Sequence, residues 1–316
     1  MGFTHLHTHS YYSFLRGLPS PKELADHAAR LEMPALGLTD HHSLSGAVEF
    51  QDACHQVGIQ PILGLEVEVE IPSDLETIVP GILTLLAIDM TGWRSLCRIS
   101  SRLDGDSDIL PFTRLAEEAS GLLCLTGGKR GGLTRLTSSS QPQLAERWAA
   151  QLSEAFSQRL YIELQIHAPD DHEVCENLAS LAHQIHLPTV ATHDIHYLEA
   201  ERGHLQKVAT AIRLIQPVKE VDQQACAPPH AEFIASQDML DLFADFPQAL
   251  AAVDEVASRC NLELPLGKVH FPEILVIGGI TSQERLRQKA EAGAARLYGE
   301  VTAALQDRLE QILIFG

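Results

Sequence analysis

The sequence lacks the features of a membrane protein and of a disulfide-stabilised secreted protein. No apolar run approaches the roughly 20 residues needed to span a bilayer. The first residues, MGFTHLHTHS, contain neither the basic region nor the apolar stretch of a secretory signal. The six cysteines are scattered without a C-x-x-C pair, which argues against a thiolate zinc site and a disulfide framework. We therefore expect a cytoplasmic protein with no membrane partner.

Basic residues are also scarce. The 316 residues include 23 lysines and arginines against 42 aspartates and glutamates, for a formal net charge of -19. A protein that holds a nucleic-acid backbone by itself normally presents a basic surface. We therefore expect contact with DNA only locally, through a bound metal, or through a partner. Histidine, by contrast, is abundant: the placement of the 16 histidines is the most informative feature of the chain.

Short apolar segments alternate with amphipathic ones along the first 200 residues. Several are rich in Leu, Ile and Val without alternation, as expected of parallel strands buried on both faces. Strands are predicted at 3–8, 35–40, 61–69, 82–88, 122–126, 160–166 and 188–193. Helices are predicted after the capping box Ser20-Pro21-Lys22-Glu23 and at 43–57, 91–103, 141–157 and 171–186. This alternation predicts an α/β protein whose parallel strands form a distorted (βα)7 TIM-like barrel.

After about residue 200 the strand signal fades and helical patterns follow. Helices are predicted at 199–215, 236–244 and 247–260 and, as one long helix, at 282–313. Pro228-Pro229 and Gly278-Gly279 mark breaks between them. We predict three parts: the barrel at 1–215, a linker and helices packing on the barrel at 216–275, and a further helical segment at 276–316.

Four groups of histidines and carboxylates stand at or near the predicted carboxyl ends of strands. They are His5, His7 and His9; Asp40 and His41; Glu66; and Asp194 and His196. His7 and His9 are two residues apart in a strand, so their side chains share a face. Functional groups of such barrels collect at the rim formed by the carboxyl ends of the strands, which predicts one metal centre there. Asp40 fits a helix cap equally well.

The mixture of imidazole and carboxylate suits zinc, manganese or iron. A carboxylate that bridges two ions, as Glu66 could, suits a multi-metal phosphoesterase. Two weaker signals leave alternatives open. Segment 127–132, Gly-Gly-Lys-Arg-Gly-Gly, could cradle a phosphate with its backbone N–H groups, but it lacks the Walker spacing, so a plain flexible loop is favoured. His167 follows the sixth strand and could face the rim, although a solvent-exposed position is favoured.

These groups and their neighbours resemble the motifs of the PHP (polymerase and histidinol phosphatase) domain. The matching segments are His5-Leu6-His7-Thr8-His9-Ser10, Thr39-Asp40-His41, Gly64-Leu65-Glu66 and Asp194-Ile195-His196-Tyr197. The flanking segment Gly46-Ala47-Val48-Glu49-Phe50 is similar to bacterial DNA polymerase III alpha subunits, and Phe14-Leu15-Arg16-Gly17 is closer to their error-prone branch. The resemblance implies a PHP-type barrel within a polymerase for replication or translesion synthesis. The rest of that chain and other replication or repair subunits would be its partners, and DNA would be reached only through the full polymerase.

In that family, residues 276–316 would lead towards the polymerase core, and the carboxylates that add nucleotides lie beyond residue 316. The chain itself should therefore not polymerise DNA. The resemblance also implies lost metal ligands, because the family often has Asp where Arg16 stands, His where Ile82 stands, and Cys or His near Gly128. Arg16 could then place its guanidinium where an ion would otherwise lie.

The ligands that the resemblance leaves for one ion, zinc or manganese, are His7, His9, Glu66 and Asp194. His41 and His196 would form an incomplete second group. Three functions stay open: a mainly structural domain with a reduced metal site, an active metal-dependent phosphoesterase such as a 3′–5′ exonuclease, and an interaction module without metal.

Overall fold

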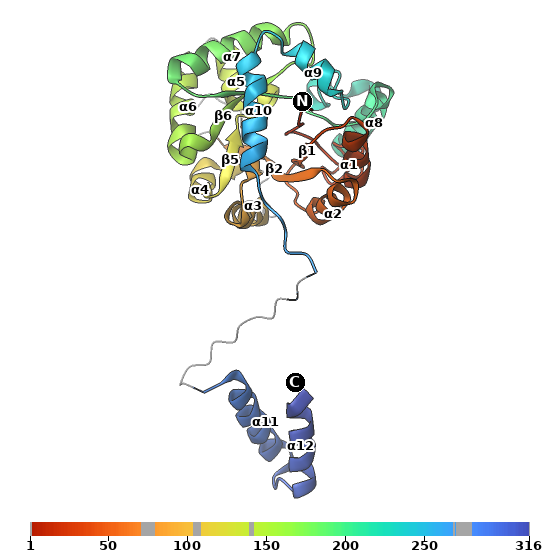
Figure 1. Cartoon of the computed structure of the whole chain (residues 1–316), viewed down its shortest axis with the longest axis vertical. Coiled ribbons are helices and arrows are strands. Elements are labelled where there is room, and N and C mark those ends of the chain that lie inside the picture. Colours follow the sequence, from red (N-terminus) through yellow and green to blue (C-terminus); the bar gives the residue numbers. More distant parts are fainter. Residues whose placement is uncertain are drawn as a thin grey trace. The chain divides into compact units, whose positions relative to one another are not determined.

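The structure is a computed structural model that describes residues 2–70, 80–103, 109–138, 142–267, 269 and 280–315. Contacts within the chain divide it into two compact units, Met1–Leu264 and Pro265–Gly316. The first unit contains every described strand, and Figure 1 shows most of its helices arranged around them. The boundary predicted at 275–276 lies outside the described residues.

One curled sheet forms the centre of the first unit. Its described strands are β1 (Ala35–Leu38), β2 (Gln60–Glu70), β3 (Gly81–Ala87), β4 (Leu110–Pro111), β5 (Leu122–Leu125), β6 (Leu160–Gln165) and β7 (Thr189–Thr192). They follow the order β1-β2-β3-β5-β6-β7, with the short β4 paired to the end of β2. Nearly every residue of these strands is buried. The α/β barrel-like class predicted from the alternating pattern is confirmed.

The prediction that all the strands run parallel is wrong for β3. This strand is antiparallel to β2 and to β5, whereas the pairs β1–β2, β5–β6 and β6–β7 are parallel. Only residues 71–80 connect β2 to β3, and parallel neighbours need a crossover of about a dozen residues or more. The short connection therefore turns β3 back along β2. Its amino end, not its carboxyl end, meets the rim where β5 ends, as the bridge between Ile82 and Gly131 shows.

The N-terminal segment, predicted as a regular strand over 3–8, instead forms single bridges to both ends of the sheet. His5 pairs with Leu36 of β1, and Thr8 pairs with Ile195 just after β7. The backbone N–H of Gly37 donates to the carbonyl of His5 at 2.7 Å. A Cβ at residue 37 would lie 2.7 Å from the carbonyl oxygen of Leu6, so only glycine allows this approach. The segment thus joins β1 to β7 and brings its histidines to the rim.

The helices of the first unit are α1 (Pro21–Arg30), α2 (Ala47–Val57), α3 (Met90–Leu103), α4 (Phe112–Glu117), α5 (Gly132–Ser138), α6 (Pro142–Phe156), α7 (Asp171–Ile185), α8 (Gly203–Leu214), α9 (Ser236–Leu242) and α10 (Pro247–Arg259). Short 3-10 turns are η2 (Gly128–Arg130), η3 (Ser157–Arg159), η4 (Ala200–Arg202), η5 (Val218–Glu220) and η6 (Gln223–Ala225). The capping box predicted for α1 is confirmed: Glu23 N–H donates to Ser20 Oγ at 3.1 Å, and Ser20 N–H donates to Glu23 Oε2 at 2.8 Å.

The residues after α8 belong to the first unit as far as Leu264. Helix α10 packs against β7. The side chain of Gln51 in α2 makes two hydrogen bonds with the backbone of Leu264, at 2.7 and 3.1 Å. These contacts fasten α10 and Leu264 to the barrel.

The second unit holds α11 (Ser282–Tyr298) and α12 (Ala303–Phe315). The single helix predicted at 282–313 is wrong, because Gly299 has a positive φ of 73° and ends α11. Arg287 of α11 pairs with Glu310 of α12, with Nη2 to Oε2 at 2.8 Å. None of the described helices is long and apolar enough to cross a membrane.

Candidate metal centre

Three separate parts of the chain bring histidines and carboxylates to one rim of the barrel. His7 and His9 come from the N-terminal segment, and Asp194 follows the end of β7. Glu66 lies in the middle of β2 rather than at the end of a strand, because β2 continues to Glu70. The chain that follows β1 continues to pair with β2, through a bridge between His41 and Glu66. Glu66 therefore stands beside the residues that follow the carboxyl end of β1.

The four atoms that face one another are two imidazole nitrogens and two carboxylate oxygens, and all lie within 4.8 Å of one another. His7 Nε2 is 3.2 Å from Glu66 Oε2 and 3.8 Å from Asp194 Oδ1. His9 Nε2 is 3.0 Å from Asp194 Oδ1 and 3.7 Å from Glu66 Oε2. A tetrahedral zinc ion with bonds of about 2.0–2.1 Å separates its ligands by roughly 3.3 Å. The four distances lie on both sides of that value, so the four side chains fit one ion.

Unpartnered polar atoms support this fit. His9 Nε2 and Asp194 Oδ1 are buried and have no hydrogen-bond partner among the described residues. Buried polar atoms are nearly always partnered, and an unpartnered one costs about 1–3 kcal/mol. An ion between them would satisfy both atoms. Among the described residues, these four form the one cluster of candidate ligands that meets the spacing of a metal site.

The outer nitrogens of the two histidines are held by hydrogen bonds. His7 Nδ1 is 2.8 Å from Glu163 Oε1, and His9 Nδ1 is 2.9 Å from Ser13 Oγ. Each bond leaves Nε2 directed at the cluster, which is the arrangement that orients histidine ligands in metal proteins. Glu163 is fully buried and also accepts hydrogen bonds from Thr192 Oγ1 at 2.6 Å and from Gly127 N–H at 2.9 Å.

The charge states of the cluster suit a cation. Burial alone would raise the pKa of Glu66, but the charge of Arg130 and hydrogen bonds with His41 and His7 hold it well below its ordinary value. Burial would likewise raise the pKa of Asp194, and His196, His7 and Arg130 lower it strongly. Burial lowers the pKa of His9 to about 3, so this imidazole is neutral. Ionised carboxylates and a neutral imidazole are the forms that bind metals.

The pKa of His7 shifts in the opposite direction from that of His9. Burial would lower its pKa, but the carboxylates of Glu163 and Asp194 raise the pKa of His7 well above its ordinary value. Without a metal, this imidazole therefore carries a proton and the positive charge that the carboxylates require. Binding an ion would displace that proton.

Arg130 supplies a second positive charge at the cluster. Its Nη2 lies 3.0 Å from Glu66 Oε2 and 3.4 Å from Asp194 Oδ2. The family resemblance implies that Arg16 could place its guanidinium where an ion would otherwise lie, but the arginine that contacts these carboxylates is Arg130. The backbone carbonyl of Arg16 accepts a hydrogen bond from Gln206 Nε2 at 3.3 Å, and burial with the nearby charge of Arg213 lowers the pKa of its guanidinium to about 10.

The two histidines predicted as an incomplete second group each contact one carboxylate. His41 Nδ1 is 2.7 Å from Glu66 Oε1. His196 Nε2 is 3.0 Å from Asp194 Oδ1, and its ring stacks on His9 at a centroid distance of 4.3 Å. Both histidines therefore lie beside the four-residue cluster, on different carboxylates.

The other candidates fasten the rim. Asp40 accepts hydrogen bonds from the backbone and hydroxyl groups of Ser10 and Ser13, at 2.6–3.2 Å. His5 Nε2 lies 2.9 Å from the carbonyl of Ile234, away from the four-residue cluster. His167 is buried, so the prediction of a solvent-exposed position is wrong. Its Nε2 accepts a hydrogen bond from the backbone N–H of Asp194 at 3.4 Å, which holds the backbone of that candidate ligand in place.

Sequence reasoning missed Arg130 and Glu163 as parts of the centre. Arg130 follows the buried strand β5, at the rim, but the glycines around it predict a flexible loop. Glu163 lies within β6 between apolar residues, and its spacing of two from Gln165 places both on one strand face. A buried glutamate inside an apolar strand is the signal that could have identified it.

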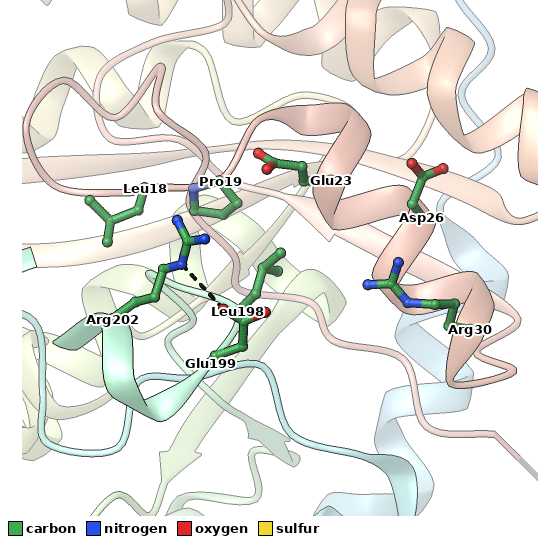
Figure 2. A pocket seen from close by; sticks show the side chains of 8 residues that line it. All are labelled: Leu18, Pro19, Glu23, Asp26, Arg30, Leu198, Glu199 and Arg202. Atoms are coloured by element: carbon green, nitrogen blue, oxygen red, sulfur yellow. Dashed lines mark hydrogen bonds and ion pairs between the residues drawn. The ribbon is translucent and has the colours of Figure 1, made fainter. Parts of the chain in front are cut away.

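A separate hollow of about 210 Å³ lies beside α1 and the segment after β7, as Figure 2 shows. Its charged side chains are Glu23, Asp26, Arg30, Glu199 and Arg202. Glu23 is already used in the cap of α1, and Arg202 Nε donates to Glu199 at 3.2 Å. None of the four candidate ligands lines this hollow, and its carboxylates Glu23 and Glu199 already have partners.

The family profile of the PHP domain matches residues 5–167 of this chain. The chain is 31% identical over 315 residues to the DNA polymerase III subunit alpha of Escherichia coli K12, covering 98% of this chain and 27% of that relative. It is 33% identical over 314 residues to the error-prone DNA polymerase of Mycobacterium bovis, covering 96% of this chain and 29% of that relative. The chain thus spans less than a third of the length of these curated relatives.

Among solved structures, the chain is similar to an amidohydrolase from Chromobacterium violaceum, with 19% identity, a TM-score of 0.43, and coverage of 61% of this chain and 87% of that one. It is also similar to a putative metal-dependent phosphoesterase from Bifidobacterium adolescentis, with 15% identity, a TM-score of 0.39 and the same coverage. The family profile, which covers more than half of the chain, decides the assignment: the chain belongs to the PHP domain family.

Proposed function

We propose that this chain serves as the PHP domain of a DNA polymerase III alpha-type or error-prone polymerase, in DNA replication or translesion synthesis. Its role is mainly structural, and its centre holds one divalent ion, zinc or manganese, on His7, His9, Glu66 and Asp194. The observation that carries this proposal is the spacing of 3.0–3.8 Å between imidazole nitrogens and carboxylate oxygens, which fits a single ion.

The origin of the ligands supports a structural role. They come from the N-terminal segment, from β2 and from the residues after β7. The N-terminal segment joins the ends of the sheet by single bridges, which are weak compared with a continuous ladder. An ion bound to all three parts would clamp this junction, because it binds the folded arrangement and not the unfolded chain.

The burial of the ligands points in the same direction. His7 and His9 are 0–1% exposed, and Glu66 and Asp194 are 0–2% exposed. A metal that reacts with a phosphate ester supplies a nucleophile and stabilises the leaving oxygen, and for this the ester must reach the ion. Ligand side chains sealed at this level favour holding an ion over turning over a substrate.

As part of such a polymerase, the domain has the remainder of the polymerase chain as its first partner. Other replication or repair subunits would follow, in the cytoplasm, and DNA would be bound only by the full-length protein. The charge supports this division, because a domain with a net charge of -19 needs other parts of a polymerase to hold DNA.

The test combines metal analysis with an activity assay. The purified chain, never exposed to chelator, is measured for zinc, manganese and iron by mass spectrometry and assayed on a 3′-labelled oligonucleotide and on a small phosphate ester. We expect about one ion per chain and no turnover. A chain that folds and binds no metal would instead be an interaction module.

The alternative is an active metal-dependent phosphoesterase. The unpartnered Nε2 of His196, 3.0 Å from Asp194 Oδ1, favours it, because this nitrogen could complete a larger centre. Metal-dependent turnover that disappears in Asp194→Asn would establish the alternative.

A further inference from the structure

The glycine-rich segment 127–132 is neither a flexible loop nor an open phosphate cradle. Its backbone N–H groups at Gly127 and Lys129 donate to the buried side chains of Glu163 and Gln165, at 2.9 and 3.0 Å. The carbonyl of Gly128 accepts a hydrogen bond from Thr134 Oγ1 at 2.6 Å. These groups are therefore not available to a phosphate, and the segment is fastened to β6 and α5.

The glycines are required by this close packing. Gly127 and Gly128 have positive φ angles of 80° and 51°. A Cβ at Gly127 would overlap the carbonyl oxygen of Ile82, and one at Gly128 would overlap the side-chain amide of Gln165. A Cβ at Gly131 would overlap the carbonyl of Thr126. The segment follows one path, and that path places Arg130 at the carboxylates.

The guanidinium of Arg130 contacts the atoms that a second ion would need. A two-ion centre holds its ions about 3.5–4 Å apart, commonly with a shared carboxylate. Glu66 Oε2 faces His7 and also Arg130, and Asp194 presents Oδ1 to His9 and Oδ2 to Arg130. Asp194 is thus divided between the four-residue cluster and the arginine, one oxygen to each, whereas the two share Glu66 Oε2.

We propose that Arg130 is a resident cation that takes the place of a second metal ion and limits the centre to one. This inference rests on the function proposed above. The contacts support it: the guanidinium already pairs with Glu66 Oε2 and Asp194 Oδ2. A divalent ion bound to these same oxygens beside the guanidinium would place two buried cations against each other, which is costly at low dielectric.

Removal of the arginine would leave a usable site. Glu66 Oε2 and Asp194 Oδ2 would lose their contact with the guanidinium of Arg130. His41 Nδ1, 2.7 Å from Glu66 Oε1, could serve as a further ligand. A pocket of about 460 Å³ borders Arg130 and also Lys129 and Arg135, so an ion could enter from that side. Arg135 donates to the carbonyl of Pro80 at 2.8 Å and pairs with neither carboxylate, which makes it the matched control.

The experiment measures the number of zinc or manganese ions per chain after gel filtration, for the wild type and for variants at both arginines. We expect one additional ion in Arg130→Ala and in Arg130→Gln, which keeps hydrogen-bonding capacity but has no charge. Arg130→Lys, which keeps the charge, and Arg135→Ala should bind the wild-type number. Chelation should lower the melting temperature of Arg130→Ala more than that of Arg135→Ala, because the carboxylates then lose both the ion and the guanidinium.

The outcomes separate this inference from the proposed function. Equal metal content in Arg130→Gln and wild type, with both folded, overturns the inference, as does a wild type that binds two or more ions. A wild type without metal and an Arg130→Gln variant with one ion would support the inference and overturn the one-ion centre of the proposed function. If Arg130→Ala does not fold, the Gln and Lys variants decide.

Discussion

The two sides of the barrel rim differ in what they bring to the metal centre. The side formed by the N-terminal segment, β2 and the residues after β7 supplies the four candidate ligands. The side formed by the start of β3 and the end of β5 supplies Ile82 and Gly128, whose side chains have no ligand atom, and Arg130. On our proposal, the first side coordinates an ion and the second contributes a fixed positive charge.

On the proposal above, this difference would let a centre with one ion keep its electrostatic balance. Buried carboxylates require positive charge, whether from ions or from side chains. Where the side at β3 and β5 offers no ligand, the glycine-rich segment positions a guanidinium against Glu66 and Asp194. The predictions below separate the two contributions.

Asp194→Asn should have the largest effect, because Asp194 serves both sides. It contacts His9 and His196 with Oδ1 and Arg130 with Oδ2. Loss of its charge leaves buried partners uncompensated, at a cost of about 3–5 kcal/mol. We expect little bound metal and a correspondingly lower free energy of unfolding, measured by mass spectrometry and denaturant titration.

Asp40→Asn is the matched control for that change. Asp40 is buried nearby but accepts its hydrogen bonds from Ser10 and Ser13. This substitution should cost about 1–3 kcal/mol and lower metal content far less than Asp194→Asn, because Asp40 reaches a ligand only through Ser13, the partner of His9. If Asp40→Asn lost the metal and Asp194→Asn kept it, our assignment of the ligands would be wrong.

Gly128→Ala should test whether the arginine side is as closely built as the ligand side. Residue 128 has a positive φ of 51°, and an added methyl group would overlap Gln165. We expect a loss of about 2–4 kcal/mol of unfolding free energy. Gly58→Ala has the same backbone problem with φ of 77° but no atom within 4 Å of the new methyl, so it should cost only about 1–2 kcal/mol. Equal losses of unfolding free energy in denaturant titrations would show that segment 127–132 shifts to accommodate the added methyl group.

Glu163→Gln should weaken both sides at once, since Glu163 connects His7 with the backbone of Gly127. The amide keeps the shape but loses the charge that orients His7. We expect a fall in metal affinity of about 10–100-fold, measured with a competing chelator, and a stability loss of about 1.5–3 kcal/mol. Glu118→Gln is the control, because its carboxylate pairs with Arg98 and Arg102 of α3. Unchanged metal affinity in Glu163→Gln would show that Glu163 does not orient His7 for metal binding.

The sequence predicted the ligand side better than the arginine side. The spacing of His7 and His9 predicts two imidazoles on one face of an extended segment, and both reach the cluster. His5 has the same spacing from His7 yet contacts Ile234, because the segment is not a regular strand and its path depends on distant partners. The direction of β3 is likewise not encoded in its apolar pattern and follows from the length of the connection before it.

The exchange of Arg16 for Arg130 shows the same limit. Both residues lie near the rim, and a motif comparison shows only which position has changed, not which side chain fills the space. That outcome depends on the path of segment 127–132, which is fixed by contacts with Ile82 and Gln165 from other strands. Burial of a charged residue in an apolar strand, as at Glu163, is visible in sequence, whereas its partners are a property of the closed barrel.

The smallest expected effect concerns DNA. The one pair of adjacent basic residues that could attract a phosphate backbone is already used, since Lys129 pairs with Asp171 and Arg130 with Glu66 and Asp194. With a net charge of -19, the chain should bind a labelled oligonucleotide more weakly than the roughly 10⁻⁴–10⁻⁶ M typical of non-specific binding at physiological salt. Fluorescence anisotropy should give the same result before and after chelation, because an ion in the centre would be bound by the buried carboxylates Glu66 and Asp194 and not by the surface. Tight binding that weakens steeply with salt would contradict this prediction.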